Sequence, residues 1–265
     1  MNGNCLALII GNSRLHWAWF IGAILQEAWD TDHLPAATVE ALIQQWACGV
    51  MPEILPPQLV SQQLKAPIQL PLYVASVVPE QTKLWQTYSA STVITLEQVP
   101  LLGLYPTLGI DRALALLGAG ETYGYPVLVI DAGTALTFTG ADADKQLIGG
   151  AILPGLGLQL KSLARSTAAL PAIQLAPQLP SRWAKQTSAA IESGVVYTVL
   201  AGIQDFINDW RCQFPDSQIA LTGGDSRLLL TYLQAQFPDE THHLMADPYL
   251  IFWGMRSLLQ GKQET

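Results

Sequence analysis

The stretch that decides the fold runs from Val127 to Gly140 and reads VLVIDAGTALTFTG. Its first four residues predict a buried strand, and the alternating segment Leu136-Thr137-Phe138-Thr139 predicts a second one. Between them lies the tight turn Asp131-Ala132-Gly133-Thr134-Ala135. Such a turn suits phosphate and magnesium, because glycine admits a phosphate to the backbone, the hydroxyl and amides donate to its oxygens, and the carboxylate holds a metal. An ordinary hairpin turn is the alternative, since Asp and Gly are common in turns.

The same pattern occurs near the N-terminus, where Leu6–Phe20 reads LALIIGNSRLHWAWF. Its turn, Gly11-Asn12-Ser13, aligns with Gly133-Thr134-Ala135. A third predicted strand is followed by a glycine turn at 219–226, which reads IALTGGDS, and an apolar helix comes next. The repeated strand–turn–strand unit predicts two related half-folds.

Two further motifs are Gly109-Ile110-Asp111-Arg112 and GGAILPG at 149–155. With IGNS at 10–13 and DAGTA at 131–135 they make a set of four in order along the chain. This set resembles type III pantothenate kinases, within the acetate-and-sugar-kinase, Hsp70 and actin superfamily. The resemblance covers most of residues 5–255 and is weakest over 30–100. It implies an α/β fold of two actin-like (ribonuclease-H-like) domains, each a mixed β-sheet flanked by helices, with an ATP cleft between them. We expect these domains at residues 1–108 and 109–265.

The activity that the resemblance implies is ATP-dependent phosphorylation of pantothenate to 4′-phosphopantothenate, the first step of coenzyme A biosynthesis. Asp111 is the expected general base, with Gly109 and Arg112 beside it in the pantothenate site. Thr187 matches a family position whose hydroxyl binds pantothenate. Tyr105 matches a pantothenate-side tyrosine, although the family usually has a longer spacer before the glycine of the GxDR motif. Without the resemblance, Asp111 would be an acid at a helix start, Arg112 its solvated partner and Thr187 an N-cap.

On the ATP side, the resemblance implies that Asp131 organises Mg²⁺ and phosphate, and that Gly133 and Thr134 contact phosphate. Gly11, Asn12 and Ser13 would form the opposing phosphate loop. Gly223 and Gly224 would form the adenosine-side turn; a loop leading into a helix is the alternative reading. The family also implies a monovalent cation, K⁺ or NH₄⁺, beside the phosphates.

One position departs from the family. Its first motif usually reads Asp-x-Gly-Asn-Thr/Ser, whereas this chain has Ile9-Ile10-Gly11-Asn12-Ser13, without the acid that helps to hold the metal or orient phosphate. The kinase reading is favoured because Asp111 and Asp131 both remain, and a pocket without chemistry needs neither. A non-catalytic regulator or assembly factor with the same ATP fold is the alternative, and Ile9 favours it. A sugar or polyphosphate enzyme of the superfamily is a third reading, which the GxDR motif disfavours.

Composition and the absence of certain motifs disfavour several other classes of protein. The chain has 265 residues, a formal charge of −8 and no basic run, which disfavours a nucleic-acid surface. Neither GxGxxG nor GxxxxGK[ST] is present. No apolar run reaches the roughly 20 residues that span a bilayer, and three scattered cysteines fit neither a disulfide framework nor a CxxC metal site. We therefore expect a cytoplasmic protein with reduced thiols that does not bind membranes.

Hydrophobic patterning places the remaining elements. We expect strands over 5–30, 72–77, 92–96 and 146–153, an irregular connection over 50–71, and helices over 37–48, from 109 to about 118, 155–163, 187–210 and 248–260. The tryptophans of the first strands (Trp17, Trp19 and Trp29) should share one core face. The apolar stripe of the 187–210 helix is longer than one domain face needs, and the family resemblance implies a homodimer in which one subunit helps to close the pantothenate site of the other.

Overall fold

The structure is a computed structural model that describes residues 3–48, 50, 70–167, 170–239, 241 and 243–261. The chain divides into two compact units. The first holds residues up to Pro100, Tyr105–Leu114 and the chain from Met255 onward, and the second holds Leu101–Leu104 and Ala115–Gly254. The expected division into domains at residues 1–108 and 109–265 remains a prediction. Most of the connection expected over 50–71 lies outside the described residues.

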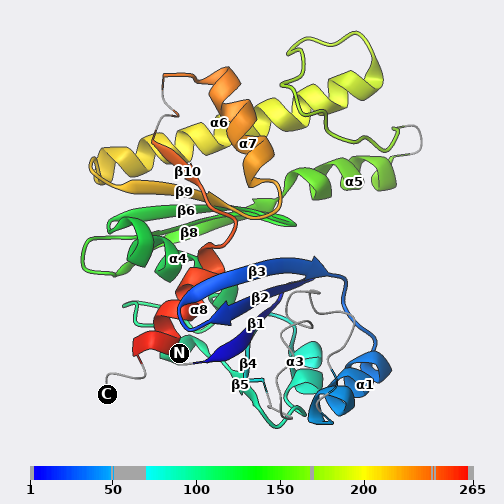
Figure 1. Cartoon of the computed structure of the whole chain (residues 1–265). Coiled ribbons are helices and arrows are strands. Elements are labelled where there is room, and N and C mark those ends of the chain that lie inside the picture. The colour runs from blue at the N-terminus through cyan, green and yellow to red at the C-terminus, as the bar shows by residue number, and fades with distance from the viewer. Residues whose placement is uncertain are drawn as a thin grey trace. The chain divides into compact units, whose positions relative to one another are not determined.

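The first unit is built on a five-stranded sheet in the order β3-β2-β1-β4-β5 (Figure 1). Its central strand β1 pairs antiparallel with β2 and parallel with β4. The strands are β1 (Asn4–Ile10), β2 (Leu15–Ile21), β3 (Ile24–Thr31), β4 (Leu72–Ser76) and β5 (Ser91–Val93). Helices α1 (Ala36–Ala47) and α3 (Pro79–Trp85) pack on one face, and a short 3₁₀ turn, Leu96–Gln98, follows β5.

Tryptophans dominate the core of this unit. Trp17 and Trp29 are opposite each other on β2 and β3, and their rings stack with centroids 5.9 Å apart. Trp85 meets Trp17 edge to face at 5.1 Å. Trp19 belongs to the same cluster, two residues along β2 and therefore on the same face. The predicted tryptophan face is confirmed as core, and such aromatic pairs each stabilise by about 0.5–1.5 kcal/mol beyond their burial.

The second unit repeats the strand order of the first. Its sheet runs β10-β9-β6-β7-β8, with β6 antiparallel to β7 and parallel to β9 (Figure 1). The strands are β6 (Val127–Ala132), β7 (Ala135–Ala141), β8 (Leu147–Pro154), β9 (Gln218–Thr222) and β10 (Leu244–Ala246). Strand β6 takes the place of β1 and β7 that of β2, so the predicted duplication of the half-fold is confirmed.

Helices α5 (Leu156–Ser166), α6 (Thr187–Gln213) and α7 (Ser226–Gln236) cover one face of this second sheet. The sequence predicts an apolar stripe along α6 that consists of Ile191, Val195, Val199, Ile203, Phe206 and Trp210. These residues lie in that core, except that Phe206 is 41% exposed and stacks on Phe138 of β7. Among the described helices, α6 alone has the length and composition to cross a membrane. Its buried stripe gives the apolar composition a role inside the protein.

Two other helices, α4 (Ile110–Tyr123) and α8 (Leu250–Gly261), contribute residues to both units. They cross closely, since a Cβ on Gly118 would lie 1.9 Å from the carbonyl oxygen of Leu250. The predicted start of α8 at residue 248 is two residues early. The sequence favours Asp247 as the N-cap with Pro248 at the first helical position. The side chain of Asp247 accepts a hydrogen bond from the N–H of Tyr249 at 2.8 Å, two residues on, in the turn that leads into the helix.

Helix α3 was not expected from the sequence. It is only seven residues long, which is too short for an apolar period to emerge. Its start signal is a proline at the first helical position, Pro79. Strand β5 ends at Val93 instead of residue 96.

Candidate functional site

The expected pantothenate residues other than Thr187 gather at the start of α4, within the first unit. Asp111 and Arg112 lie in the first turn of α4, and the N–H of Arg112 donates to Oδ1 of Asp111 at 2.8 Å. The guanidinium of Arg112 donates from Nη1 to the hydroxyl of Tyr105 at 3.1 Å. Arg112 is only 8% exposed, whereas Tyr105 is 41% exposed. The expectation that Arg112 is a solvated surface partner, which applied without the resemblance, is therefore wrong.

Gly109 is required by the position of the Asp111 carboxylate. A Cβ on Gly109 would lie 2.3 Å from Oδ1 of Asp111, far inside contact distance. The carboxylate folds back over the backbone of Gly109 because no side chain occupies that space. The GxDR spacing thus has a steric cause: the glycine clears the volume that the acid uses.

The expected ATP residues of the second unit meet around the end of β6. Asp131 is the next-to-last residue of the strand, paired with Thr137 on β7 and Thr222 on β9. In the turn that follows, the N–H of Gly133 donates to the carbonyl of Ala135 at 3.0 Å. The carbonyl of Thr134 accepts from the N–H of Gly155, just before α5.

Gly155 and Gly223 close in on this turn from two sides. A Cβ on Gly155 would lie 2.2 Å from the carbonyl oxygen of Gly133. Gly223 has φ of +87°, and its Cβ would lie 2.4 Å from Oδ1 of Asp131. Gly224 comes next and has open space where a Cβ would be. The structure therefore brings the predicted Gly223 turn against Asp131.

Asp225 is a residue of this cluster that the sequence analysis did not select. Its N–H donates to the carbonyl of Ala132 at 2.9 Å, and it precedes α7 as the N-cap residue without a side-chain capping bond. Burial raises the pKa of the Asp225 carboxyl above its usual value. Asp225 directly follows Gly223 and Gly224 in the sequence, and this position was the signal that could have marked it as a residue of the site.

The turn Gly11-Asn12-Ser13 joins β1 and β2 in the first unit. The N–H of Gly11 donates to the carbonyl of Arg14 at 3.0 Å, and the carbonyl of Gly11 accepts from Nε2 of His33 at 2.8 Å. Asn12 and Ser13 are exposed. The turn is therefore held at its glycine while its polar residues face outward.

Thr187 belongs to the second unit. It is the first residue of α6, and its side chain is exposed. The N-cap of α6 is Gln186, without a side-chain capping bond, so the interpretation of Thr187 as N-cap is wrong.

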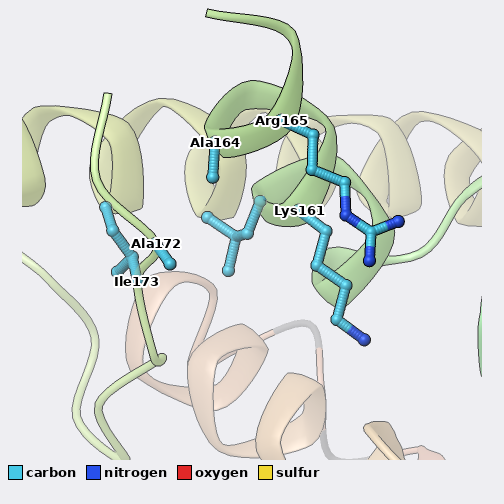
Figure 2. Close-up of a pocket in the computed structure, with 6 residues that line it drawn as sticks. Lys161, Ala164, Arg165, Ala172 and Ile173 are labelled. Carbon is cyan, nitrogen blue, oxygen red and sulfur yellow. The ribbon is translucent and has the colours of Figure 1, made fainter. Parts of the chain in front are cut away.

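A cavity of about 150 Å³ lies elsewhere in the second unit, between α5 and the segment after Leu170 (Figure 2). It is lined by Leu160, Lys161, Ala164, Arg165, Ala172 and Ile173. This volume is below the roughly 300 Å³ at which pockets begin to hold a drug-sized ligand. None of the predicted site residues lines it.

Comparison with known proteins decides the family. The sequence profile described as type III pantothenate kinase matches residues 5–209. The chain belongs to this family. It is 53% identical to the type III pantothenate kinase of Nostoc sp. (strain PCC 7120), over 97% of this chain and 94% of that protein. It is 45% identical to the type III pantothenate kinase of Synechocystis sp. (strain PCC 6803), over 97% and 90% of the two chains.

Membership of the type III pantothenate kinase family confirms the expected activity class, a kinase. Solved structures agree on the fold. A putative Baf family transcriptional activator from Campylobacter jejuni has a TM-score of 0.63 at 20% identity, covering 98% of this chain and 100% of that one. MreB 5 of Spiroplasma citri has a TM-score of 0.50 at 11% identity, covering 100% and 98%. The expected fold class, α/β with two actin-like mixed sheets flanked by helices, is confirmed.

Proposed function

We propose that this chain transfers the γ-phosphoryl group of ATP to the 4′-hydroxyl of pantothenate, with Asp111 as general base. Family membership supports the reaction, and the cluster at the start of α4 carries the assignment of residues. Phosphoryl transfer needs positioning and charge neutralisation more than covalent chemistry. A fixed carboxylate that accepts the proton of the attacking hydroxyl contributes about 10²–10⁴ in rate.

Arg112 is the proposed partner of the pantothenate carboxylate. Its guanidinium is almost fully buried and is held by the hydroxyl of Tyr105, so little side-chain entropy remains to be lost on binding. A charge-assisted pair with a carboxylate is stronger than a neutral hydrogen bond. Gly109 would complete this side by leaving room for the Asp111 carboxylate, and the exposed hydroxyl of Thr187 would bind the substrate as well.

ATP would be held by three turns. Gly133 and Thr134 would contact phosphate in the second unit, and Gly11, Asn12 and Ser13 would do so in the first. Gly223 and Gly224 would lie beside adenosine, where missing side chains admit a flat base or ribose.

Asp131 fits a role in holding Mg²⁺. Carboxylate oxygens are ligands that Mg²⁺ prefers, and the ion usually keeps several waters, so one carboxylate with the ATP phosphates suffices. Gly223 keeps the space next to Oδ1 of Asp131 free of a side chain. When bound, the ion neutralises charge on the phosphates. K⁺ or NH₄⁺ beside the phosphates rests on the family resemblance.

We also propose a cytoplasmic homodimer. Strand β8 is an edge of its sheet, and it exposes Ile148 and Ile152 by 48% and 65%. Leu158 on α5 is 43% exposed. Exposed apolar side chains on an edge strand favour coverage by a partner. Sedimentation of the full chain tests this assembly directly.

The substrate assignment is tested by pantothenate-dependent ADP release in Arg112→Lys. Lysine keeps the charge but loses the planar fork. The expected result is a KM for pantothenate raised about tenfold or more, with a smaller change in the KM for ATP. Arg165→Ala, at an exposed arginine of α5, is the control. An unchanged KM for pantothenate in Arg112→Lys would remove Arg112 from the substrate site.

A further inference from the structure

Residues 170–186 of the second unit precede α6 and form neither a helix nor a strand (Figure 1). The part from 170 to 182, which we call the strap, packs three apolar side chains against the core of this unit: Ile173, Leu175 and Leu179. An irregular segment has no ladder of backbone hydrogen bonds, so its buried backbone groups need other partners. In the strap these partners are side chains of α6 and α7.

Side chains of two helices hold the strap near its middle. The N–H of Ala176 donates to Oε1 of Glu192 on α6 at 3.0 Å. The carbonyl of Ala176 accepts a hydrogen bond from the hydroxyl of Tyr232 on α7, whose side chain is buried. Both backbone groups of one strap residue are therefore bound, each by a different helix.

The end of the strap is held by Ser193 and Tyr197 of α6. The hydroxyl of Tyr197 donates to the carbonyl of Pro180 at 2.8 Å, and the guanidinium carbon of Arg182 lies 4.1 Å from the centroid of the Tyr197 ring. The hydroxyl of the buried Ser193 donates to the carbonyl of Arg182 at 2.6 Å. Tyr197 thus makes two contacts of different kinds with the strap, a hydrogen bond and a cation–π contact.

The first turn of α6 follows this attachment and has no cap of its own. Its N-cap residue, Gln186, makes no side-chain capping bond, and the turn contains no acidic residue that would favour the positive end of the helix. Thr187, which is assigned to pantothenate, is the first residue of this turn. Only residues 183–186 separate it from Arg182. The bonds that hold the end of the strap therefore also restrict how far the uncapped turn can open.

We propose that Tyr197 is a positioning residue for pantothenate: it holds the strap at Pro180 and Arg182 and thereby keeps the first turn of α6 in the conformation in which Thr187 contacts the substrate. The inference rests on the proposed role of Thr187. A binding group that is already ordered loses less conformational entropy when the ligand binds. Loosening the strap should therefore raise the KM for pantothenate, whereas a purely structural ring would lower stability without separating this KM from the KM for ATP.

The test compares Tyr197→Phe and Tyr197→Leu with the wild type in pantothenate-dependent ADP release by the full chain. Phenylalanine keeps the ring beside Arg182 and loses the hydrogen bond, so we expect the KM for pantothenate to rise about threefold. Leucine loses both contacts, and we expect a rise of about tenfold. The KM for ATP and kcat should stay within about twofold in both variants. Thr231→Ala is the matched control, because it removes an exposed hydroxyl-to-carbonyl hydrogen bond of 3.0 Å on α7 and should leave both KM values unchanged.

Thr187→Ala sets an upper limit on these effects. If Tyr197 acts through Thr187, Tyr197→Leu raises the KM for pantothenate by no more than Thr187→Ala does, and the double variant matches Thr187→Ala alone. Trypsin probes the segment directly, since cleavage after the exposed Lys185 should be faster in a folded Tyr197→Leu than in the wild type. An unchanged KM for pantothenate in Tyr197→Leu, or additive increases in the double variant, would overturn the proposal.

Calorimetric Kd values for pantothenate, measured on the same variants, keep this test separate from the proposed reaction. A wild type that binds pantothenate but forms no phosphorylated product would contradict the proposed function, and the Kd values would then decide the role of Tyr197 by the same criteria. A Kd for Thr187→Ala equal to that of the wild type would overturn positioning through Thr187.

Discussion

Replacing Gly109 with alanine should reduce the rate of catalysis by displacing the Asp111 carboxylate, although Gly109 has no side chain that could take part in the reaction. The new Cβ would lie 2.3 Å from Oδ1 of Asp111. Ordinary contact begins about 1 Å further out, so the carboxylate must move by roughly that distance or rotate away. A displacement of about 1 Å in a reacting group can cost about 10²-fold in rate. We therefore expect kcat to fall by about two orders of magnitude, with the fold retained.

The assay is pantothenate-dependent ADP release, run beside Asp111→Asn and the double variant. If Gly109 acts through Asp111, the alanine should cost little more once the carboxylate is gone. Gly202→Ala is the control, because a Cβ there on α6 meets nothing within 4 Å and should leave kcat unchanged. Wild-type kcat in Gly109→Ala, or fully additive losses in the double variant, would refute the steric reasoning.

Two further perturbations probe the second unit. Gly155→Ala would place a Cβ 2.2 Å from the carbonyl oxygen of Gly133, so the turn must shift. We expect the free energy of unfolding to fall by about 1–3 kcal/mol and ATP to bind more weakly. Unfolding in urea measures the stability, and an unchanged urea midpoint would contradict this prediction. Burial raises the pKa of Asp225, so the folded state binds the proton more tightly than the unfolded chain and ionisation costs stability as pH rises. Asp225→Asn should therefore unfold at a higher temperature than wild type at pH 7, with the gain vanishing below about pH 4, and a gain that persists in acid would argue against this cause.

Much of the fold followed from local pattern. The strand–turn–strand units were predictable because buried apolar runs bounded by glycine turns have few other solutions. Apolar residues recur every three or four positions over a long stretch of α6, and this pattern predicted both the helix and its buried face. Helix α3 was not predicted because seven residues hold too little periodicity. The start of α8 was predicted to within two residues, since helix ends are the least sharply defined part of a helix.

The candidate site was predictable in its motifs but not in its contacts. The approach of Gly223 to Asp131 joins residues distant in sequence, and only strand pairing of β6 with β9 brings them together. Arg112 looked like a surface charge by composition, yet tertiary packing buries it against Tyr105.

The most direct test of the central assignment is pantothenate-dependent ADP release by wild type and Asp111→Asn, with Mg²⁺, ATP and K⁺, and with the phosphorylated product identified. The account predicts turnover by the wild type, which has Ile9 in its first motif, and a loss of about 10²–10⁴ in kcat for the variant with both substrates still bound. A variant that keeps wild-type kcat would contradict Asp111 as the base. A folded wild type that binds ATP but forms no phosphopantothenate would contradict the kinase assignment and favour a non-catalytic role.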